Sequence, residues 1–393
     1  MILDGALRAI FETLAGSTSG LASATGAGRW HVLFGGRQRP LLMSDGEYRL
    51  QKQWLSYFIG DRLRTAYART LLKLHSMLPR VHLLPDVRFP GVRAARAPET
   101  PPPYGALAAI QIGTPGPYQK ASALLITGAG EGLALAKIAL VPGADRMVVS
   151  EANWLRLLET ERGLAGEVPQ LLAEGDLGNG RRFLVMTLAP MTMTTTEFTP
   201  AHERFLRRLG RSRMEVRSFG SSSCCDSLER EFTAIASSLT RREAVRLGSA
   251  LHDCRVAMSD FVCPFIVSQG DFAWWNIRVH RDGIFVFDWE YARLGANPLA
   301  DLFHYHLIQR AASGRAIGQR FLARLLRQAE SFARRHYPES RWQPARVSGL
   351  ALAYVLDVLF QYCRANGDRI DPDDLVVRGY WSLMERRSMW MAS

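Results

Sequence analysis

Oxygen-bearing side chains stand close together in one short region of the sequence. Asp271 follows an apolar run, Asn276 comes five positions later, and Asp288 follows a second apolar run. Carboxylate and amide oxygens are the ligands that Mg²⁺ prefers, and phosphoryl transfer from a nucleotide also needs a carboxylate beside the acceptor hydroxyl. The set contains no thiol or imidazole, so its chemistry favours Mg²⁺ over zinc.

A β-hairpin is expected to position these residues. The strand-like run at 266–268 precedes the loop, Ile277-Arg-Val follows it, and the Asp-Gly pair at 282–283 is typical of a tight hairpin turn before Ile284-Phe-Val-Phe. Pairing of the two strands would bring the loop and Asp288 to the same end. Any one of these polar residues alone is more often an ordinary turn or cap residue, and only their joint spacing predicts a site.

The same region carries a recognisable motif. It consists of Gln269-Gly-Asp271-Phe-Ala-Trp-Trp-Asn276, then Phe287-Asp288-Trp-Glu-Tyr-Ala, then Pro298-Leu-Ala-Asp301. This arrangement resembles the aminoglycoside phosphotransferase and choline kinase superfamily, which has a protein-kinase-like fold. In that family the loop begins with His-Gly-Asp and reaches Asn after four further residues, so the spacing is kept here.

The resemblance implies a role for each residue of the motif. Asp271 would be the catalytic Asp, with Asn276 and Asp288 as the Mg²⁺ ligands. Asp301 would brace the catalytic loop. Gln269, which belongs to the catalytic loop, replaces the family's His; Gln can hydrogen-bond but carries no charge, so we expect activity to be tuned rather than abolished.

Lys137 is a cation inside the apolar stretch Leu133–Leu140. A buried unpaired ammonium is costly, so Lys137 requires an acidic partner unless it points outward from an exposed strand face. By the same resemblance the partner is Glu151 on the following helix, and the pair would hold Lys137 against the nucleotide phosphates. Glu159 and Glu161 are the alternative partners.

Two further segments complete the predicted nucleotide site. The turn Thr114-Pro-Gly-Pro-Tyr-Gln119 has a single glycine, Gly116, and is expected to cover the phosphates although it is no multi-glycine loop. The backbone around Thr187 and Ala189, after Phe183-Leu-Val-Met, would bind the nucleotide base. The side chains there do not distinguish ATP from GTP.

Apolar periodicity predicts the elements around these residues. Residues 104–190 carry strand-like runs at 107–113, 120–127, 133–140 and 182–188, with a helix capped by Ser150 before the last of them. This is the order of a kinase small lobe, which binds the nucleotide. Residues 191–393 are mostly helical and would form the large lobe with the catalytic loop and acceptor site. The predicted fold class is α+β, a bilobal protein-kinase-like fold with a small antiparallel-sheet lobe and a mainly helical large lobe.

Residues 1–95 are expected to form an extra N-terminal α/β unit of unknown role. Strands are predicted at 29–34 and 41–44 and helices around Trp54 and at 61–78, and the proline-rich stretch 89–103 is typical of a linker. No chemistry is recognisable in this unit, so binding of a partner is the role left open for it.

Charge and composition limit the classes of partner. The net charge of +12 would suit nucleic acid, an anionic membrane surface or a phosphorylated ligand. Among the 49 basic residues arginine greatly outnumbers lysine, which indicates coding composition. The arginines recur on helical faces without a nucleic-acid motif, so we expect no nucleic-acid binding. The alternative that these helices bind nucleic acid predicts binding that weakens steeply as the salt concentration rises.

No membrane-spanning or secreted form is expected. The longest apolar run, Gly349–Phe360, contains Asp357 and is too short to cross a bilayer. The N-terminus lacks the basic-then-apolar order of a secretory signal. The five cysteines have no paired CxxC spacing, which favours a reducing compartment and a cytoplasmic location.

The predicted function is transfer of the γ-phosphate of ATP or GTP to a hydroxyl of a sugar, aminoglycoside-like or amino-alcohol acceptor. Glu290 after the metal strand would favour a cationic alcohol, unless it caps a helix. His304 and His306 are expected to be partly buried helix residues rather than ligands. The alternative is a kinase-like pseudoenzyme that senses nucleotide or scaffolds a partner, because Gln269 departs from the family pattern.

Overall fold

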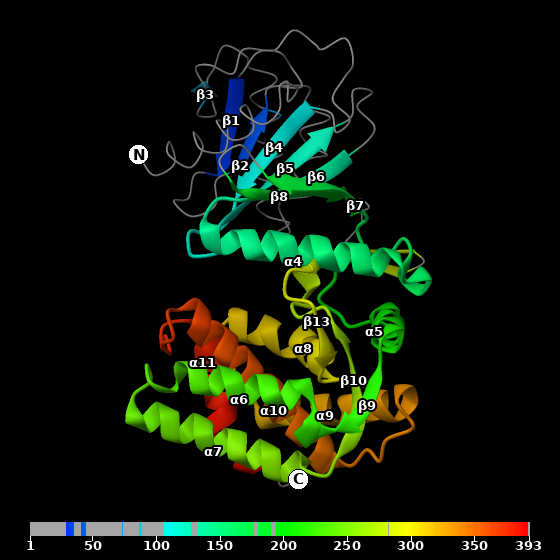
Figure 1. The fold of residues 1–393 in the computed structure, drawn as a ribbon, viewed down its shortest axis with the longest axis vertical. Coiled ribbons are helices and arrows are strands. Elements are labelled where there is room, and N and C mark those ends of the chain that lie inside the picture. Colours follow the sequence, from blue (N-terminus) through cyan, green and yellow to red (C-terminus); the bar gives the residue numbers. More distant parts are fainter. Residues whose placement is uncertain are drawn as a thin grey trace. The chain divides into compact units, whose positions relative to one another are not determined.

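The structure is a computed structural model that describes residues 29–34, 41–44, 73, 86–88, 106–126, 133–176, 180–189, 194–281 and 283–391. The chain divides into two compact units: residues 1–160 with 168–194, and residues 161–167 with 195–393. The first unit is built on an antiparallel sheet and the second is mainly helical (Figure 1). These contents confirm the predicted α+β fold class.

One sheet of eight antiparallel strands organises the first unit, in the order β3-β1-β2-β4-β5-β6-β8-β7. Its strands are β1 (Arg29–Phe34), β2 (Leu41–Ser44), β3 (Asp86–Arg88), β4 (Ala106–Ile112), β5 (Lys120–Ile126), β6 (Leu133–Ala139), β7 (Leu171–Asp176) and β8 (Arg182–Thr187). The strands predicted in both halves of the unit are confirmed. Because β2 pairs with β4, the N-terminal strands extend the sheet that β4 to β8 form.

The helices expected around Trp54 and at 61–78, apart from Lys73, and the linker expected at 89–103 lie outside the described residues.

The helix after β6 starts earlier than the sequence suggested. α4 (Pro142–Glu159) begins with a proline in its first turn, where the fixed φ of proline suits a helix start. Ser150 lies in the middle of this helix, so its prediction as the cap was wrong. The buried residues Ala144, Val148 and Leu155 form the stripe that packs against β6 and β8.

The helical unit is assembled around one buried helix. Its α-helices are α5 (Pro200–Ser212), α6 (Ser223–Ala236), α7 (Arg241–Met258), α8 (Ala300–Ala312), α9 (Gln319–His336), α10 (Pro344–Ala365), α11 (Leu375–Glu385) and α12 (Ser388–Met391). α10 is apolar on nearly all sides and contacts α6, α7, α8, α9 and α11, as expected for a core helix. Among the described helices, none is both long enough and apolar enough to cross a membrane.

Short strands interrupt the helices of this unit. β10 (Val262–Ser268) is the middle strand of a sheet with β9 (Glu215–Ser218) and β13 (Arg293–Ala296), and β11 (Ile277–His280) forms a hairpin with β12 (Gly283–Val286). The hairpin is confirmed. The sequence did not indicate β9 or β13, because each has only four residues and no clear alternation of apolar and polar side chains.

Candidate active site

The predicted catalytic residue, Asp271, lies in the loop after β10 and is held by Asn276. The Asn276 side-chain nitrogen donates to the Asp271 carboxylate oxygen Oδ2 at 2.8 Å and to its carbonyl oxygen at 3.0 Å. A short 3₁₀ turn at Trp274–Asn276 makes this return contact within five residues of chain. With its nitrogen engaged in this way, Asn276 has its amide oxygen left over as a ligand atom.

Gln269 is fully buried and uses every polar position of its side chain. Its oxygen accepts from the backbone N–H of Asp271 at 2.9 Å, and its nitrogen donates to the carbonyl oxygens of Phe287 at 3.2 Å and Asp288 at 2.5 Å. The side chain therefore ties the loop after β10 to the segment after β12. A neutral His has one donor and one acceptor, so Gln supplies one more donor than the residue it replaces in the family motif.

Gly270 allows the loop to pass close to a neighbouring segment. Its φ of +84° lies in the left-handed region, and an added Cβ would come within 2.2 Å of the Tyr291 carbonyl oxygen. No other residue fits both conditions without strain. The loop of the motif is therefore packed directly against the turn that follows Asp288.

Asp301 braces the loop from the first turn of α8. It accepts from the Ser268 hydroxyl at 2.7 Å and from the backbone N–H groups of Gln269 at 2.8 Å and Gly270 at 3.1 Å. Burial raises the pKa of Asp301, and the three hydrogen bonds act in the opposite direction. Three donors directed at one carboxyl group stabilise its ionised form.

The hairpin brings the predicted metal ligands to one end, as expected from the sequence. Ile277 pairs with Val286, and the backbone N–H of Phe287 donates to the Asn276 carbonyl oxygen at 3.1 Å. Asp288 then adopts a φ of +67°. A non-glycine residue with positive φ stores about 1–2 kcal/mol of backbone strain, and such residues occur preferentially at functional sites.

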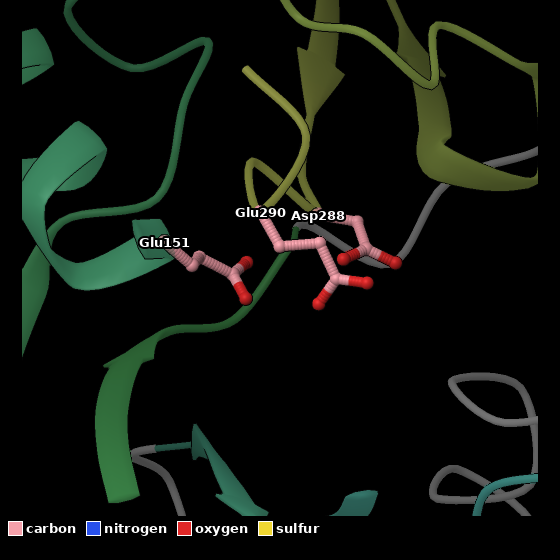
Figure 2. Close-up of side chains that lie close together, drawn as sticks. All are labelled: Glu151, Asp288 and Glu290. Carbon is pink, nitrogen blue, oxygen red and sulfur yellow. The ribbon is translucent and has the colours of Figure 1, made fainter. Parts of the chain in front are cut away.

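Glu290 adds a second carboxylate beside Asp288. Ligand oxygens of the two side chains lie within 4.8 Å of each other, and Figure 2 shows both side chains leaving the same turn. This turn leads into β13, and the next helix starts only at Ala300, so the alternative that Glu290 caps a helix was wrong. Carboxylate and amide oxygens are hard donors, so the residues present fit Mg²⁺.

His304 contacts the predicted catalytic residue, which the sequence did not suggest. It lies on α8 with 7% of its surface exposed, as expected for a buried helix residue, but its Nε2 lies 2.9 Å from the Asp271 carboxylate oxygen Oδ1. The available signal was its position three residues after Asp301, because residues three apart on a helix share a face. His306 makes no such contact: it lies 5.3 Å from the Phe198 ring, and burial lowers its pKa to about 4.

In the first unit, Lys137 and Glu151 form a buried pair. The Lys137 nitrogen lies 2.6 Å and 2.7 Å from the two carboxylate oxygens of Glu151. Only 6% of the surface of Lys137 is exposed, and none of that of Glu151. The outward orientation considered for Lys137 was therefore wrong. Glu159 instead accepts from the backbone of Leu171, and Glu161 pairs with Arg213.

The single-glycine turn after β4 is tied to the start of α4. The Leu140 N–H donates to the Gln119 carbonyl oxygen at 3.0 Å, and a Cβ on Gly143 would come within 2.1 Å of the Pro117 carbonyl oxygen. Gly143 thus permits the close approach of turn and helix. A Cβ on Gly116 would meet nothing within 4 Å, so packing does not require that glycine.

The predicted base-binding segment begins at the end of β8. The Thr187 N–H donates to the Gln170 carbonyl oxygen at 3.0 Å, and the Thr187 hydroxyl accepts from the Gln170 N–H at 2.9 Å. These groups of Thr187 are therefore already engaged within the sheet unit. Ala189 is described, and residues 190–193 after it lie outside the described residues.

The predicted site residues thus fall into two groups, one in each unit. The second unit brings together Gln269, Asp271, Asn276 and Asp288, and the first unit brings together Lys137 and Glu151.

No protein-family model matches the chain, and no curated protein matches it in sequence. In structure, the chain is similar to the apo form of a thermostable mutant of aminoglycoside phosphotransferase APH(4)-Ia, with 17% identity, coverage of 72% of this chain and 95% of that chain, and a TM-score of 0.48. It is also similar to ADP-bound aminoglycoside phosphotransferase APH(2'')-Ib, with 15% identity, 69% and 90% coverage, and a TM-score of 0.41. Amicoumacin kinase hAmiN in complex with AMP-PNP and Ca²⁺ gives 10% identity, 68% and 86% coverage, and a TM-score of 0.43. Two of these three structures are aminoglycoside phosphotransferases, the family that the motif from Gln269 to Asp301 resembles.

Proposed function

We propose that this protein is a kinase that transfers the γ-phosphate of ATP or GTP to a hydroxyl of a small molecule. The observation that carries the proposal is the network in which Gln269 and Asn276 hold Asp271 beside the segment of Asp288. A fixed carboxylate next to a cluster of oxygen ligands is what positions an acceptor hydroxyl and a metal-bound phosphate in such a reaction.

Asp271 would orient the acceptor hydroxyl and accept its proton. Its side chain is 26% exposed, so the carboxylate is both accessible and held in place. An ionised carboxylate has about four acceptor positions. His304 and Asn276 occupy one each, which leaves positions for the hydroxyl.

Asn276 and Asp288 would hold Mg²⁺, with Glu290 as a further candidate ligand. Bound Mg²⁺ would neutralise charge on the phosphates. The φ of Asp288 and the hydrogen bond from Gln269 to its carbonyl oxygen determine where the carboxylate leaves the chain. The protein's own contribution at this point is therefore a fixed ligand geometry.

Lys137 would bind the non-transferred phosphates. Glu151 holds its ammonium in a buried position, so the cation is pre-organised before nucleotide arrives. The turn with Gly116 would cover the phosphates, and the backbone near Thr187 and Ala189 would contact the base. The Thr187 N–H already donates to Gln170, so other groups of this segment would have to bind the base.

The acceptor is proposed to be a sugar, an aminoglycoside-like compound or an amino alcohol. Glu290 adds negative charge to the turn after β12 beyond that of the proposed metal ligand Asp288, which favours an acceptor that carries an amine. The five cysteines are all free, in keeping with a proposed location in the reducing cytoplasm.

The test is transfer by the purified full chain with MgATP or MgGTP and a panel of sugars, amino alcohols and aminoglycosides such as hygromycin B. We expect a phosphorylated product by mass spectrometry, with loss of transfer in Asp271→Asn and Asp288→Asn. Asp368→Asn is the matched control, because Asp368 is the other described non-glycine residue with positive φ and lies outside the site. Retained transfer in both site variants would refute the assignment.

The pseudoenzyme alternative predicts a different result from the same experiment. It requires that the chain binds nucleotide but forms no product with any acceptor. Its motive is the uncharged Gln269, yet this side chain keeps the loop braced. Deleting residues 1–95 would not isolate a partner-binding role, because β1 to β3 belong to the same sheet as β4 to β8.

A further inference from the structure

His304 joins Asp271 to a chain of hydrogen bonds that begins at Tyr380. Its Nδ1 lies 3.1 Å from the Tyr354 hydroxyl, and that hydroxyl lies 2.5 Å from the hydroxyl of Tyr380. All three side chains are buried, with exposures of 7%, 4% and 0%. The sequence motif and the proposed reaction account for none of these three residues.

The carboxylate sets the direction of this chain. An ionised carboxylate only accepts, so His304 must carry its hydrogen on Nε2 to bond Asp271. In the neutral ring Nδ1 then accepts from the Tyr354 hydroxyl, and the Tyr354 oxygen accepts from Tyr380. With this tautomer each group donates toward Asp271.

The chain is supported by three packed helices. His304 lies on α8, Tyr354 on α10 and Tyr380 on α11, and each of these helices contacts the other two. Burial raises the pKa of both tyrosines, so their hydroxyl groups stay protonated and remain donors. The imidazole is thus held from behind by rigid elements rather than by a loop.

This support matters because a carboxylate turns easily about its last bond. The terminal torsion of Asp is broad, so one hydrogen bond from Asn276 to Oδ2 leaves the orientation loosely defined. The second bond, from His304 to Oδ1, defines the plane of the carboxylate. The lone pairs of the Asp271 carboxylate then point toward the acceptor hydroxyl in one fixed direction.

We propose that His304 is a positioning residue that sets the orientation of the Asp271 carboxylate toward the acceptor hydroxyl, with Tyr354 and Tyr380 holding the imidazole. This inference rests on the proposed kinase function. His304 touches Asp271 and acts only through it. The acceptor's proton still passes to Asp271.

Kinetics of three variants test this role, with the acceptor identified by the panel or with water as the acceptor. His304→Leu should lower kcat roughly 100-fold, the loss typical of a misplaced reacting group, with little change in the KM for MgATP. His304→Gln should recover most of this loss, because its amide nitrogen can donate to Asp271 and its oxygen can accept from Tyr354. His306→Leu is the matched control on the same helix and should behave as the wild type.

The outcomes separate the two claims. Wild-type protein that transfers phosphate, with an unchanged kcat in a folded His304→Leu variant, would refute only the role of His304. A folded His304→Gln variant as slow as His304→Leu would also refute it, because the effect would then not come from the hydrogen bond. Wild-type protein without any transfer would refute the proposed function instead.

A measurement that needs no activity tests the contact itself. In a spectrum of ¹⁵N-histidine-labelled protein, His304 should carry hydrogen on Nε2. Its Nε2 resonance should shift in Asp271→Asn, while that of His306 stays in place. His304 with hydrogen on Nδ1 alone would overturn the proposal.

Discussion

The side-chain nitrogen of Gln269 lies 2.5 Å from the carbonyl oxygen of Asp288 and so connects the catalytic loop to the proposed metal ligand. The same side chain accepts from the Asp271 N–H at 2.9 Å. One uncharged residue thus holds the two carboxylate-bearing segments in register. The departure of Gln269 from the family's His changes the chemical group but keeps the connection.

Gln269→Glu should uncouple these segments. The substitution keeps the shape of the side chain but replaces both N–H donors with an acceptor that faces the carbonyl oxygens of Phe287 and Asp288. We expect the free energy of unfolding to fall by about 1–3 kcal/mol, as for buried polar groups left unsatisfied, and kcat to fall with it. Gln269→His, which keeps one donor and one acceptor, should lose less of both in urea denaturation and transfer assays. Equal losses in the two variants would contradict the bracing role.

Stability and activity should separate at Asp288. Its φ of +67° is tolerated by Asn and favoured by Gly, but it is costly for Ala. Asp288→Asn should therefore unfold within about 0.5 kcal/mol of the wild type, and Asp288→Ala should lose about 1 kcal/mol more, while both lose Mg²⁺-dependent transfer. Denaturation curves and Mg²⁺ titrations of transfer measure the two effects.

Asp368, with a φ of +64°, provides the matched control for this backbone effect. Asp368→Asn and Asp368→Ala should show the same order of stability and keep full activity. If Asp288→Ala were as stable as Asp288→Asn, the positive φ would not be a source of strain.

The Lys137–Glu151 pair should be separable into a structural and a binding role. Glu151→Leu removes the carboxylate that pairs with the buried Lys137 ammonium, so we expect a loss of about 3–5 kcal/mol in the free energy of unfolding. The double variant Lys137→Met with Glu151→Leu fills the same space with apolar groups and should recover most of that stability. Its affinity for MgATP, measured by calorimetry, should remain lower than that of the wild type. Wild-type MgATP affinity in the double variant would exclude a phosphate contact at Lys137.

The sequence predicted the parts of the site that are close together along the chain. The hairpin from Ile277 to Val286 follows from its turn residues and apolar runs, and the spacing from Asp271 to Asn276 places both in one loop. Local geometry decides such contacts, so local patterns can indicate them. The partner of Lys137 came from the family resemblance, and the structure shows the two side chains in contact.

Contacts set by packing between distant segments could not be predicted in this way. His304 reaches Asp271 across 33 positions of sequence, because α8 is placed against the loop by Asp301 and by the core helix α10. The local sequence offers only the spacing of His304 three residues after Asp301, which places both on one face of α8 but does not reveal that this face meets the loop. The error at Ser150 has a different cause: a local cap signal competed with Pro142, which starts the helix earlier.

His202 should make the helical unit sensitive to acid. It lies in the first turn of α5, where its Nδ1 accepts from the Thr199 N–H at 3.1 Å, and it is fully buried. Burial, with a smaller effect of His306, lowers its pKa from 6.5 to about 4. Well above pH 6.5 the ring is neutral in both the folded and the unfolded chain, so its protonation contributes no pH dependence there.

Between pH 6.5 and pH 4 the unfolded chain binds a proton at His202 that the folded chain does not. The free energy of unfolding should therefore fall as the pH is lowered through this range, by up to about 1.4 kcal/mol per pH unit. His202→Gln is the informative variant, because Gln three residues after Thr199 can still accept its N–H in a capping box but does not titrate. Urea denaturation at pH 7, 6 and 5 should show a steeper loss of stability in the wild type than in His202→Gln. Identical slopes in the two proteins would assign the acid sensitivity to other groups.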